Sequence, residues 1–169
     1  QGVNAKMLQV AAKCLGISVE NVKLESTNTT RVANTSPSAA SATADLNGKA
    51  VMDACAQIMQ RLREMVIEIK TLGDNIVVTI EDSAIFVDGV QTDLTWLSLV
   101  QHAFVRRINL SAKGHYATPV INFDKTIEKG HPFAYHVYGT AITTVTVDCL
   151  RGTYEIDSVN VMHDFGTGM

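Results

Sequence analysis

The clearest pattern in the chain is a long helical stripe in its first half. Apolar side chains recur every three or four residues, at Leu46, Ala50, Val51, Ala54, Cys55, Ile58, Leu62, Met65 and Ile69. Charged and amide side chains fill most positions between them, so the pattern predicts an amphipathic helix that ends near Gly73. Two starts remain open. Pro37 can be the first helical residue behind Ser36, or Ser38 can be the cap.

Two shorter elements precede this helix. The first is a helix with Asn4 as its N-cap and Gly16 as its stop, predicted from the apolar spacing of Met7, Val10, Ala11, Cys14 and Leu15. Residues 22–27 then alternate between apolar and polar, which predicts a half-buried strand. A polar loop follows over residues 28–37.

The second half of the chain begins with a hairpin pattern. Residues 75–81 and 84–88 are rich in Val and Ile and are separated by a short turn, so we expect neighbouring strands. A third helix is expected from about Thr92, capped by Thr92 or Asp93, with Trp96 packed beside it. Its pattern rests on Leu94, Leu97, Val100, Gln101 and Phe104.

The last third has the composition of a sheet. Residues 134–149 and 154–161 are rich in Val, Ile, Thr and Tyr, and Arg151-Gly152 is the turn between them. Residues 118–132 are weakly patterned, which favours a functional loop or a contact surface. Together the elements predict an α+β fold of two layers, with helices packed on a mainly antiparallel (mixed) sheet. We expect one domain over residues 1–169.

Composition restricts the functional classes. A chain of 169 residues with 46% hydrophobic residues can bury the core of a globular domain. A net charge of −3 argues against a nucleic-acid partner, because phosphate binding requires a basic surface. The sequence has no secretory signal pattern and no apolar run long enough for a bilayer. Three widely spaced cysteines indicate reduced thiols, so we expect a cytoplasmic protein without membrane contact.

Common catalytic motifs are missing or incomplete. Asp164-Phe165-Gly166 occurs without the other kinase motifs, and no G-x-S-x-G pentapeptide is present. Cys14 and Cys55 fall on the apolar sides of predicted helices and are interpreted as packing residues. Cys149, near a turn, is a weak candidate for thiol reactivity. None of four histidines has the spacing of a zinc helix, and we interpret all as surface or half-buried: His115, His131, His136 and His163.

The start of the long helix has an unusual composition. Residues 34–50 are mostly small or hydroxylated, so the backbone N–H groups of the first helical turn are sterically accessible. One interpretation is a simple capped helix start. The other is a cradle for an anion or a cofactor, formed by Ala39, Ala40, Ser41, Ala42 and Thr43. Composition alone does not separate the two.

Three segments carry a resemblance to a known family. They are Gln1-Gly2-x-x-x-Lys6-Met7-x-Gln9-Val10-Ala11, Asn34-Thr-Ser-Pro-Ser-Ala-Ala-Ser-x-x-Ala-Asp-Leu-Asn-Gly48 and Val161-Met-His-Asp-x-Gly166. In content, order and approximate spacing they resemble the molybdenum hydroxylases, the family of xanthine dehydrogenases and aldehyde oxidases. The N-T-S-P-x-A-A-S form looks more like the xanthine dehydrogenases. Residues 70–91 are the part least like the family.

The resemblance implies a portion of the molybdopterin-binding region, from its second half. The cofactor-binding residues implied are Gln1, Gly2, Ala40, Ser41, Ala42 and Thr43. Ala39 and Ala40 are implied to form the floor of the substrate pocket, where a larger side chain blocks entry. The implied cofactor is molybdenum-molybdopterin, with no direct metal ligand in this chain.

The implied activity is that of an oxidoreductase of purine metabolism, which hydroxylates xanthine or hypoxanthine with water as the oxygen source. No residue here is implied to be catalytic, because the family's base glutamate is expected downstream, and the isolated chain is expected to be inactive. Implied partners are the remaining molybdenum-binding domain, iron–sulfur and FAD domains or subunits, and further copies in a homo-oligomer. The alternatives are an aldehyde oxidase-type hydroxylase and a non-catalytic binding or structural module that keeps the fold.

Overall fold

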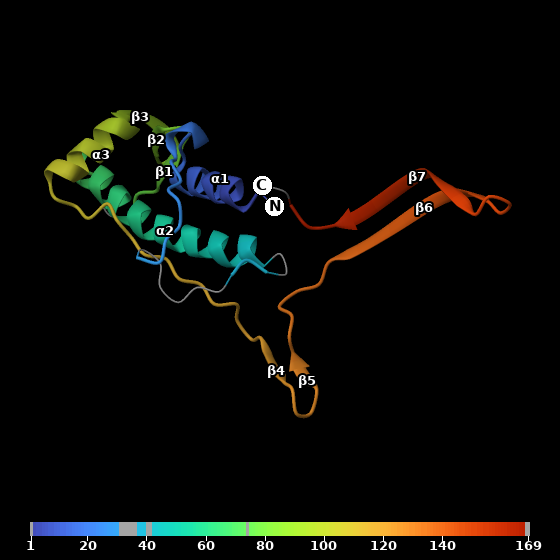
Figure 1. The fold of residues 1–169 in the computed structure, drawn as a ribbon. Helices are drawn as coiled ribbons and strands as arrows, with labels where there is room; N and C mark the ends of the chain where they lie inside the picture. Colours follow the sequence, from blue (N-terminus) through green and yellow to red (C-terminus); the bar gives the residue numbers. More distant parts are fainter. Residues whose placement is uncertain (1, 31–36, 40–41, 74, 168–169) are drawn as a thin grey trace. The chain divides into compact units, whose positions relative to one another are not determined.

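The computed structural model describes residues 2–30, 37–39, 42–73 and 75–167 (Figure 1). The elements are α1 (Val3–Leu15), the 3-10 helix η1 (Val19–Asn21), α2 (Thr43–Ile69), β1 (Val78–Glu81), β2 (Ala84–Val87), β3 (Val90–Thr95), α3 (Trp96–Val105), β4 (Asn122–Asp124), β5 (Lys129–His131), β6 (Tyr138–Asp148) and β7 (Thr153–Asp164). The strand pairs among the described residues are antiparallel. The predicted α+β class is confirmed.

The chain divides into two compact units, residues 1–117 and residues 118–169. All buried hydrophobic side chains of the described residues belong to the first unit. The expectation of one domain over residues 1–169 stays a prediction. Within the described ranges, no helix combines the length and the apolar character that crossing a membrane requires.

The core of the first unit lies where α2 and α3 meet the sheet of β1, β2 and β3. Its buried side chains are Met59, Leu62, Met65 and Val66 of α2, Val78, Ile80, Ile85 and Leu94 of the sheet, and Leu99 and Ala103 of α3. Lys70, at the C-terminal end of α2, forms an ion pair with Asp93 of β3. The hydrogen bond from Lys70 lowers the pKa of the Asp93 carboxyl below its ordinary value. The contact joins the end of the long helix to the sheet.

Helix α1 is bounded by two glycines in the left-handed region. Gly2, with φ 70°, precedes the helix, so the helix begins before the predicted cap Asn4, which lies within it. At the other end Gly16, with φ 67°, ends the helix, as predicted. The N–H groups of Gly16 and Ile17 turn back to carbonyls of the last helical turn, which is the usual way a glycine closes a helix.

Helix α2 starts later than either predicted position. Its first residue is Thr43 and its N-cap is Ala42. Pro37, Ser38 and Ala39 are exposed. Extending the helix through them would cost backbone entropy that no burial offsets, so the predictions from Pro37 and Ser38 are wrong.

The predicted hairpin is confirmed as β1 and β2, which pair from Val78↔Val87 to Glu81↔Ala84. A third strand, β3, then pairs with β2 over residues that were expected to begin a helix. Helix α3 therefore begins only at Trp96. Its cap is Thr95, whose Oγ1 accepts a hydrogen bond from the Ser98 N–H at 3.2 Å.

Two further predictions in this unit need correction. The predicted caps Thr92 and Asp93 are wrong, because both lie inside β3. Residues 22–27, predicted as a strand, are described without one, and only Val22 among them is partly buried. An alternating pattern gives a strand only where a neighbouring strand and a core are available.

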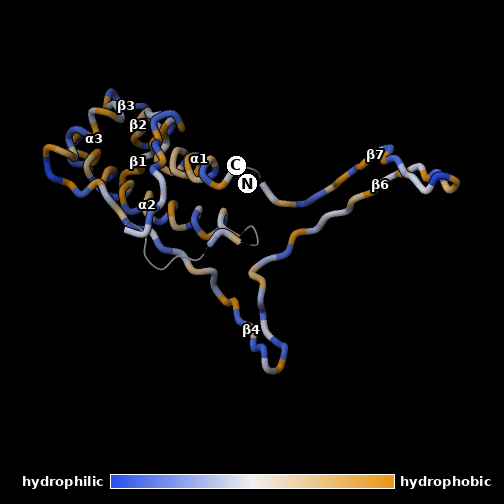
Figure 2. Tube along the Cα trace, viewed as in Figure 1, coloured by the Kyte–Doolittle hydropathy of each residue, from blue (hydrophilic) through white to orange (hydrophobic). Residues whose placement is uncertain are grey.

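The second unit consists of two hairpins. β4 and β5 pair within residues 118–132, where a loop or contact surface was predicted. β6 and β7 form a ribbon that pairs from Tyr138↔Asp164 to Asp148↔Thr153, which confirms the two predicted strands. The predicted turn at Arg151-Gly152 is also confirmed, with Gly152 at φ 68°. Hydrophobic residues recur along both long strands (Figure 2).

Candidate functional site

Helices α1 and α2 pack side by side and run in the same direction (Figure 1). The Met7 side chain lies 3.8 Å from the position of a Cβ added to Gly48. About two turns further along, the Cys14 thiol is close enough to Cys55 to interact with it electrostatically. In both contacts the two residues are the same number of positions apart in the sequence. Only helices that run parallel keep this separation constant along their length.

The N-terminal ends of the two helices are consequently level with each other. Met7 and Gly48 each lie within the first two turns of their helices, which begin at Val3 and Thr43. A helix N-terminus has free N–H groups and a partial positive charge. Two such ends at one place form a stronger site for an anion than either forms alone.

The caps of these helices leave the N–H groups open. The N-cap residues are Gly2 and Ala42, and neither has a polar side chain that could bond to the first turn. Among the described residues, no atom lies within 4 Å of the place a Cβ on Gly2 would take. The carboxylate in these two first turns, Asp45, already interacts within the chain. The common end therefore has small side chains and accessible backbone.

Local hydrogen bonds shape the approach to α2. The Ala42 N–H, at the start of the helix, donates to the Ala39 carbonyl at 3.2 Å. The Thr43 hydroxyl donates to the Ser38 hydroxyl oxygen at 2.7 Å. Ser38 is exposed, so its own hydroxyl hydrogen can be directed outward.

The predicted site residues fall into two groups. Gly2, Ala42 and Thr43 lie at the common end of α1 and α2, and Ala39 directly precedes it. Gln1, Ala40 and Ser41 lie outside the described residues. The roles predicted for both groups, in cofactor binding and in the substrate pocket, stay predictions.

An extended segment, residues 109–115, lies along α2. The sequence analysis did not predict it. Three side chains of the helix bond to its backbone: Asp53 accepts from the His115 N–H at 3.1 Å, Gln57 donates to the Lys113 carbonyl at 3.3 Å, and Arg61 donates to the Ser111 carbonyl at 3.1 Å. A Cβ on Gly114 would lie 1.8 Å from the Ala50 carbonyl oxygen. The direction is antiparallel to α2. The glycine was the available signal, because it permits this close approach.

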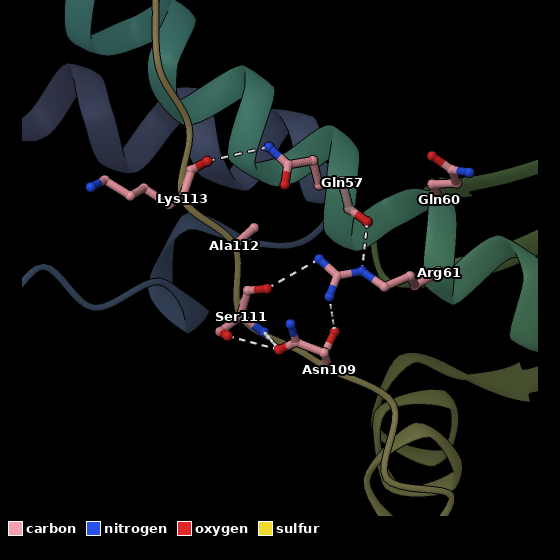
Figure 3. Close-up of a pocket in the computed structure, with 7 residues that line it drawn as sticks. All are labelled: Gln57, Gln60, Arg61, Asn109, Ser111, Ala112 and Lys113. Atoms are coloured by element: carbon pink, nitrogen blue, oxygen red, sulfur yellow. Dashed lines mark hydrogen bonds between the residues drawn. The ribbon is translucent and has the colours of Figure 1, made fainter.

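This segment borders an open pocket at the middle of α2 (Figure 3). The lining residues are Gln57, Gln60, Arg61, Asn109, Ser111, Ala112 and Lys113. The Arg61 guanidinium in its wall bonds to the carbonyls of Gln57, Asn109 and Ser111. The N–H groups of the Arg61 guanidinium hold the segment against α2, so we assign Arg61 a structural role. The pocket lies several helical turns from Thr43 and is separate from the common N-terminal end.

The remaining candidate chemistry is limited. Burial raises the pKa of the Cys55 thiol, and it also raises the pKa of the Cys14 thiol, which is only half-buried. Both shifts agree with the interpretation of these cysteines as packing residues. Cys149 is exposed, and its reactivity stays a prediction. Within the described ranges no three His, Cys, Asp or Glu side chains gather as metal ligands.

Comparison with known proteins identifies relatives along the whole chain. The family model described as "Molybdopterin cofactor-binding domain" matches residues 1–169. The chain is 35% identical to a xanthine dehydrogenase of Drosophila pseudoobscura pseudoobscura and 33% identical to a xanthine dehydrogenase/oxidase of Mus musculus, each over 100% of its length. It is also 37% identical to an aldehyde oxidase 1 of Oryctolagus cuniculus, over 98% of its length. In each case it spans 11% of the relative.

Proposed function

This chain belongs to the molybdopterin cofactor-binding domain family, and on that premise we propose that it forms one wall of the molybdopterin site in a xanthine dehydrogenase-like hydroxylase. The observation that supports this most is the common N-terminal end of α1 and α2. It brings together two segments, at Gly2 and at Ala42 and Thr43, that are far apart in the sequence.

The described residues fit an anionic cofactor such as a pterin that carries a phosphate. Two helix dipoles point their positive ends to the same place, and small side chains at Gly2 and Ala42 let a large ligand reach the backbone. Hydroxyl groups of Ser38 and Thr43 add polar atoms beside the amides. The proposed binding set is Gln1, Gly2, Ala40, Ser41, Ala42 and Thr43, with Ala39 and Ala40 at the substrate pocket.

The proposed binding residues decide which part of the reaction this chain can perform. The bound molybdenum group would supply the redox step of the hydroxylation, while this chain binds and orients it. The proposed set contains no ionisable side chain, so general-base work falls to a residue elsewhere in the parent protein. The isolated chain is accordingly proposed to be inactive.

A purine is the proposed substrate. The support is the N-T-S-P-x-A-A-S form of residues 34–41, which looks more like the xanthine dehydrogenases. Identities of 33–35% to xanthine dehydrogenases and 37% to an aldehyde oxidase do not separate the two substrates. An aldehyde is therefore the second candidate. The proposal also includes iron–sulfur and FAD domains or subunits, a homo-oligomeric assembly and a cytoplasmic location.

The direct test uses the full-length parent polypeptide. We expect the purified protein to contain molybdenum and to oxidise xanthine faster than a simple aldehyde at equal concentration. Faster turnover of the aldehyde would replace the purine assignment and keep the site. A folded parent without molybdenum, and without turnover of either substrate, would favour the non-catalytic module.

A further inference from the structure

Met7 of α1 and Gly48 of α2 form a contact between the two helices close to their N-terminal ends. Both residues are buried. A glycine inside a helix is destabilising relative to alanine, so its presence in the second turn of α2 requires a compensating reason. The reason lies in the packing, because the missing side chain of Gly48 leaves the space in which the end of the Met7 side chain lies.

The space at Gly48 has room for a single carbon. A Cβ there would lie 3.8 Å from the Met7 Cε, which is ordinary van der Waals contact. Apart from chain neighbours and the surrounding helix backbone, no other described residue has an atom within 4 Å of that position. A longer side chain would compete with Met7 for the same buried space. Extra methylenes at a packed contact move the neighbouring backbone, because a packed interior is hardly compressible.

Of the two helices, α1 is the one that such a side chain would move. α2 is fixed by the core, to which it contributes Met59, Leu62, Met65 and Val66. Among the described residues of α1, by contrast, only Met7 and Ala12 are buried. A larger residue at position 48 would therefore shift α1 and leave α2 in place.

The other end of α1 is anchored, so a displacement at Met7 turns the helix about that end. The Ser83 N–H donates to the Gly16 carbonyl at 2.7 Å, and a Cβ on Gly16 would lie 2.0 Å from the Ile80 carbonyl oxygen. Along the helix axis, Met7 lies about 14 Å from Gly16 and Gly2 lies about 21 Å from it. A shift of about 1 Å at Met7 thus becomes about 1.5 Å at Gly2. That is enough to break a hydrogen bond between an amide of the first turn and a ligand.

We propose that Gly48 and Met7 are positioning residues, which set the distance between the N-terminal ends of α1 and α2 and hence the width of the cofactor site. This rests on the proposed function, in which one anionic cofactor contacts both helix ends. The partial charge of a helix end acts only over about one turn. Both ends therefore contribute to binding only while their separation matches the ligand.

Two variants of the full-length parent test the space at position 48. Gly48→Ala adds the one carbon for which there is room, so molybdenum per polypeptide should stay within about twofold of the unaltered parent. Gly48→Met places two methionines in the space of one, and the molybdenum content should fall at least about tenfold. If Gly48→Met does not fold, Gly48→Val tests the same contact with a smaller side chain and should also lose molybdenum. Undiminished molybdenum in a folded variant of either kind would overturn the proposal.

A compensating change separates positioning from a general loss of stability. Adding Met7→Ala to Gly48→Met returns the buried volume nearly to its original value, so the double variant should regain most of its molybdenum. Ile85→Val is the control, because Ile85 is fully buried in the core of the sheet and its shortening lowers stability without touching Met7 or Gly48. Its molybdenum content should be unchanged. Equal loss in Ile85→Val and Gly48→Met, or no recovery in the double variant, would contradict the positioning role.

The same measurements distinguish this proposal from the proposed function. A folded, unaltered parent without molybdenum would overturn the proposed function, and the positioning role with it. Molybdenum in the unaltered parent together with equal molybdenum in Gly48→Met would overturn the positioning role alone. Circular dichroism of each purified variant establishes that it is folded before its metal content is compared.

Discussion

At the residue scale, Gly16 meets two requirements that no other residue type satisfies. Its φ of 67° is the left-handed conformation that ends α1, and a Cβ there would lie 2.0 Å from the Ile80 carbonyl oxygen of β1. Ser83 also donates its N–H to the Gly16 carbonyl at 2.7 Å. The residue therefore joins the end of a helix to the sheet.

Gly16→Ala should lower the free energy of unfolding by about 2 kcal/mol or more, through backbone strain together with the clash at Ile80. Gly89→Ala is the control, because Gly89 has φ 80° but open space at its Cβ position, so it costs the strain alone, about 1 kcal/mol. Urea unfolding followed by the fluorescence of Trp96, the single tryptophan, measures both. Equal losses for the two variants would contradict the close contact with Ile80.

Cys55 predicts a weakening of the fold at alkaline pH. Burial raises the pKa of its thiol above the ordinary value of 9.0, so the unfolded chain loses the proton before the folded chain does. Its contribution is complete below pH 9.0 and is lost as the pH rises through the folded pKa. Between about pH 8 and about pH 10, the free energy of unfolding measured in urea should decrease less for Cys55→Ala than for the unaltered chain. Cys149→Ala, at an exposed site, should leave the decrease unchanged.

The predicted substrate pocket can be tested at Ala40. A phenylalanine there should exclude substrate from the proposed pocket, so Ala40→Phe in the parent should abolish turnover. Ala40→Gly, which adds no bulk, should retain it. Steady-state oxidation of xanthine measures both variants. Undiminished turnover and molybdenum content in Ala40→Phe would refute the placement of Ala40 at the site.

At this scale the sequence was informative where a residue type has one physical use. Gly16 as a stop and Cys55 as a packing residue are confirmed, because a glycine after a helical stripe and a cysteine within it have few alternatives. Arg61 was missed. It lies beside the apolar stripe like any solvated charge, and its partners are backbone carbonyls some 50 residues away in sequence.

At the element scale, the segment along α2 is held by side chains of the helix and not by a strand. Arg61 supplies a planar fork of donors to carbonyls of Asn109 and Ser111 (Figure 3). Arg61→Ala should therefore lower the free energy of unfolding by about 1–2 kcal/mol. Arg63→Ala, two residues on at an exposed position, should change it by less than about 0.5 kcal/mol. Equal effects in urea unfolding would contradict the structural role.

Element boundaries show where sequence patterns lose their power. The β1–β2 hairpin and the β6–β7 strands are confirmed, because their alternation and turns are local signals. β3 was predicted as the start of a helix, because Leu94 fits the apolar spacing of a helix as well as that of a strand. The pairing of β3 with β2 makes this segment a strand. Residues 22–27 show the converse, an alternating pattern without a partner strand.

At the scale of the whole molecule, two features depend on contacts that no local pattern records. The parallel packing of α1 on α2 brings Gly2 to the level of Thr43, although the two are separated by a long connection. The second unit has strands but no buried side chain of its own among the described residues. The first supports the proposed cofactor site, and the second means that the strands of this unit have no hydrophobic core of their own.

The central claim is that the common N-terminal end of α1 and α2 binds an anionic cofactor, and one comparison tests it directly. Ala42→Asp and Ala42→Asn add side chains of the same shape at the start of α2, but only the first adds a negative charge. The charge should stabilise the helix by about 0.3–1 kcal/mol while repelling the cofactor. Molybdenum per polypeptide in the purified parent should fall at least about tenfold in Ala42→Asp relative to Ala42→Asn, since ~1.4 kcal/mol of repulsion suffices. Equal molybdenum content in the two variants would contradict the claim.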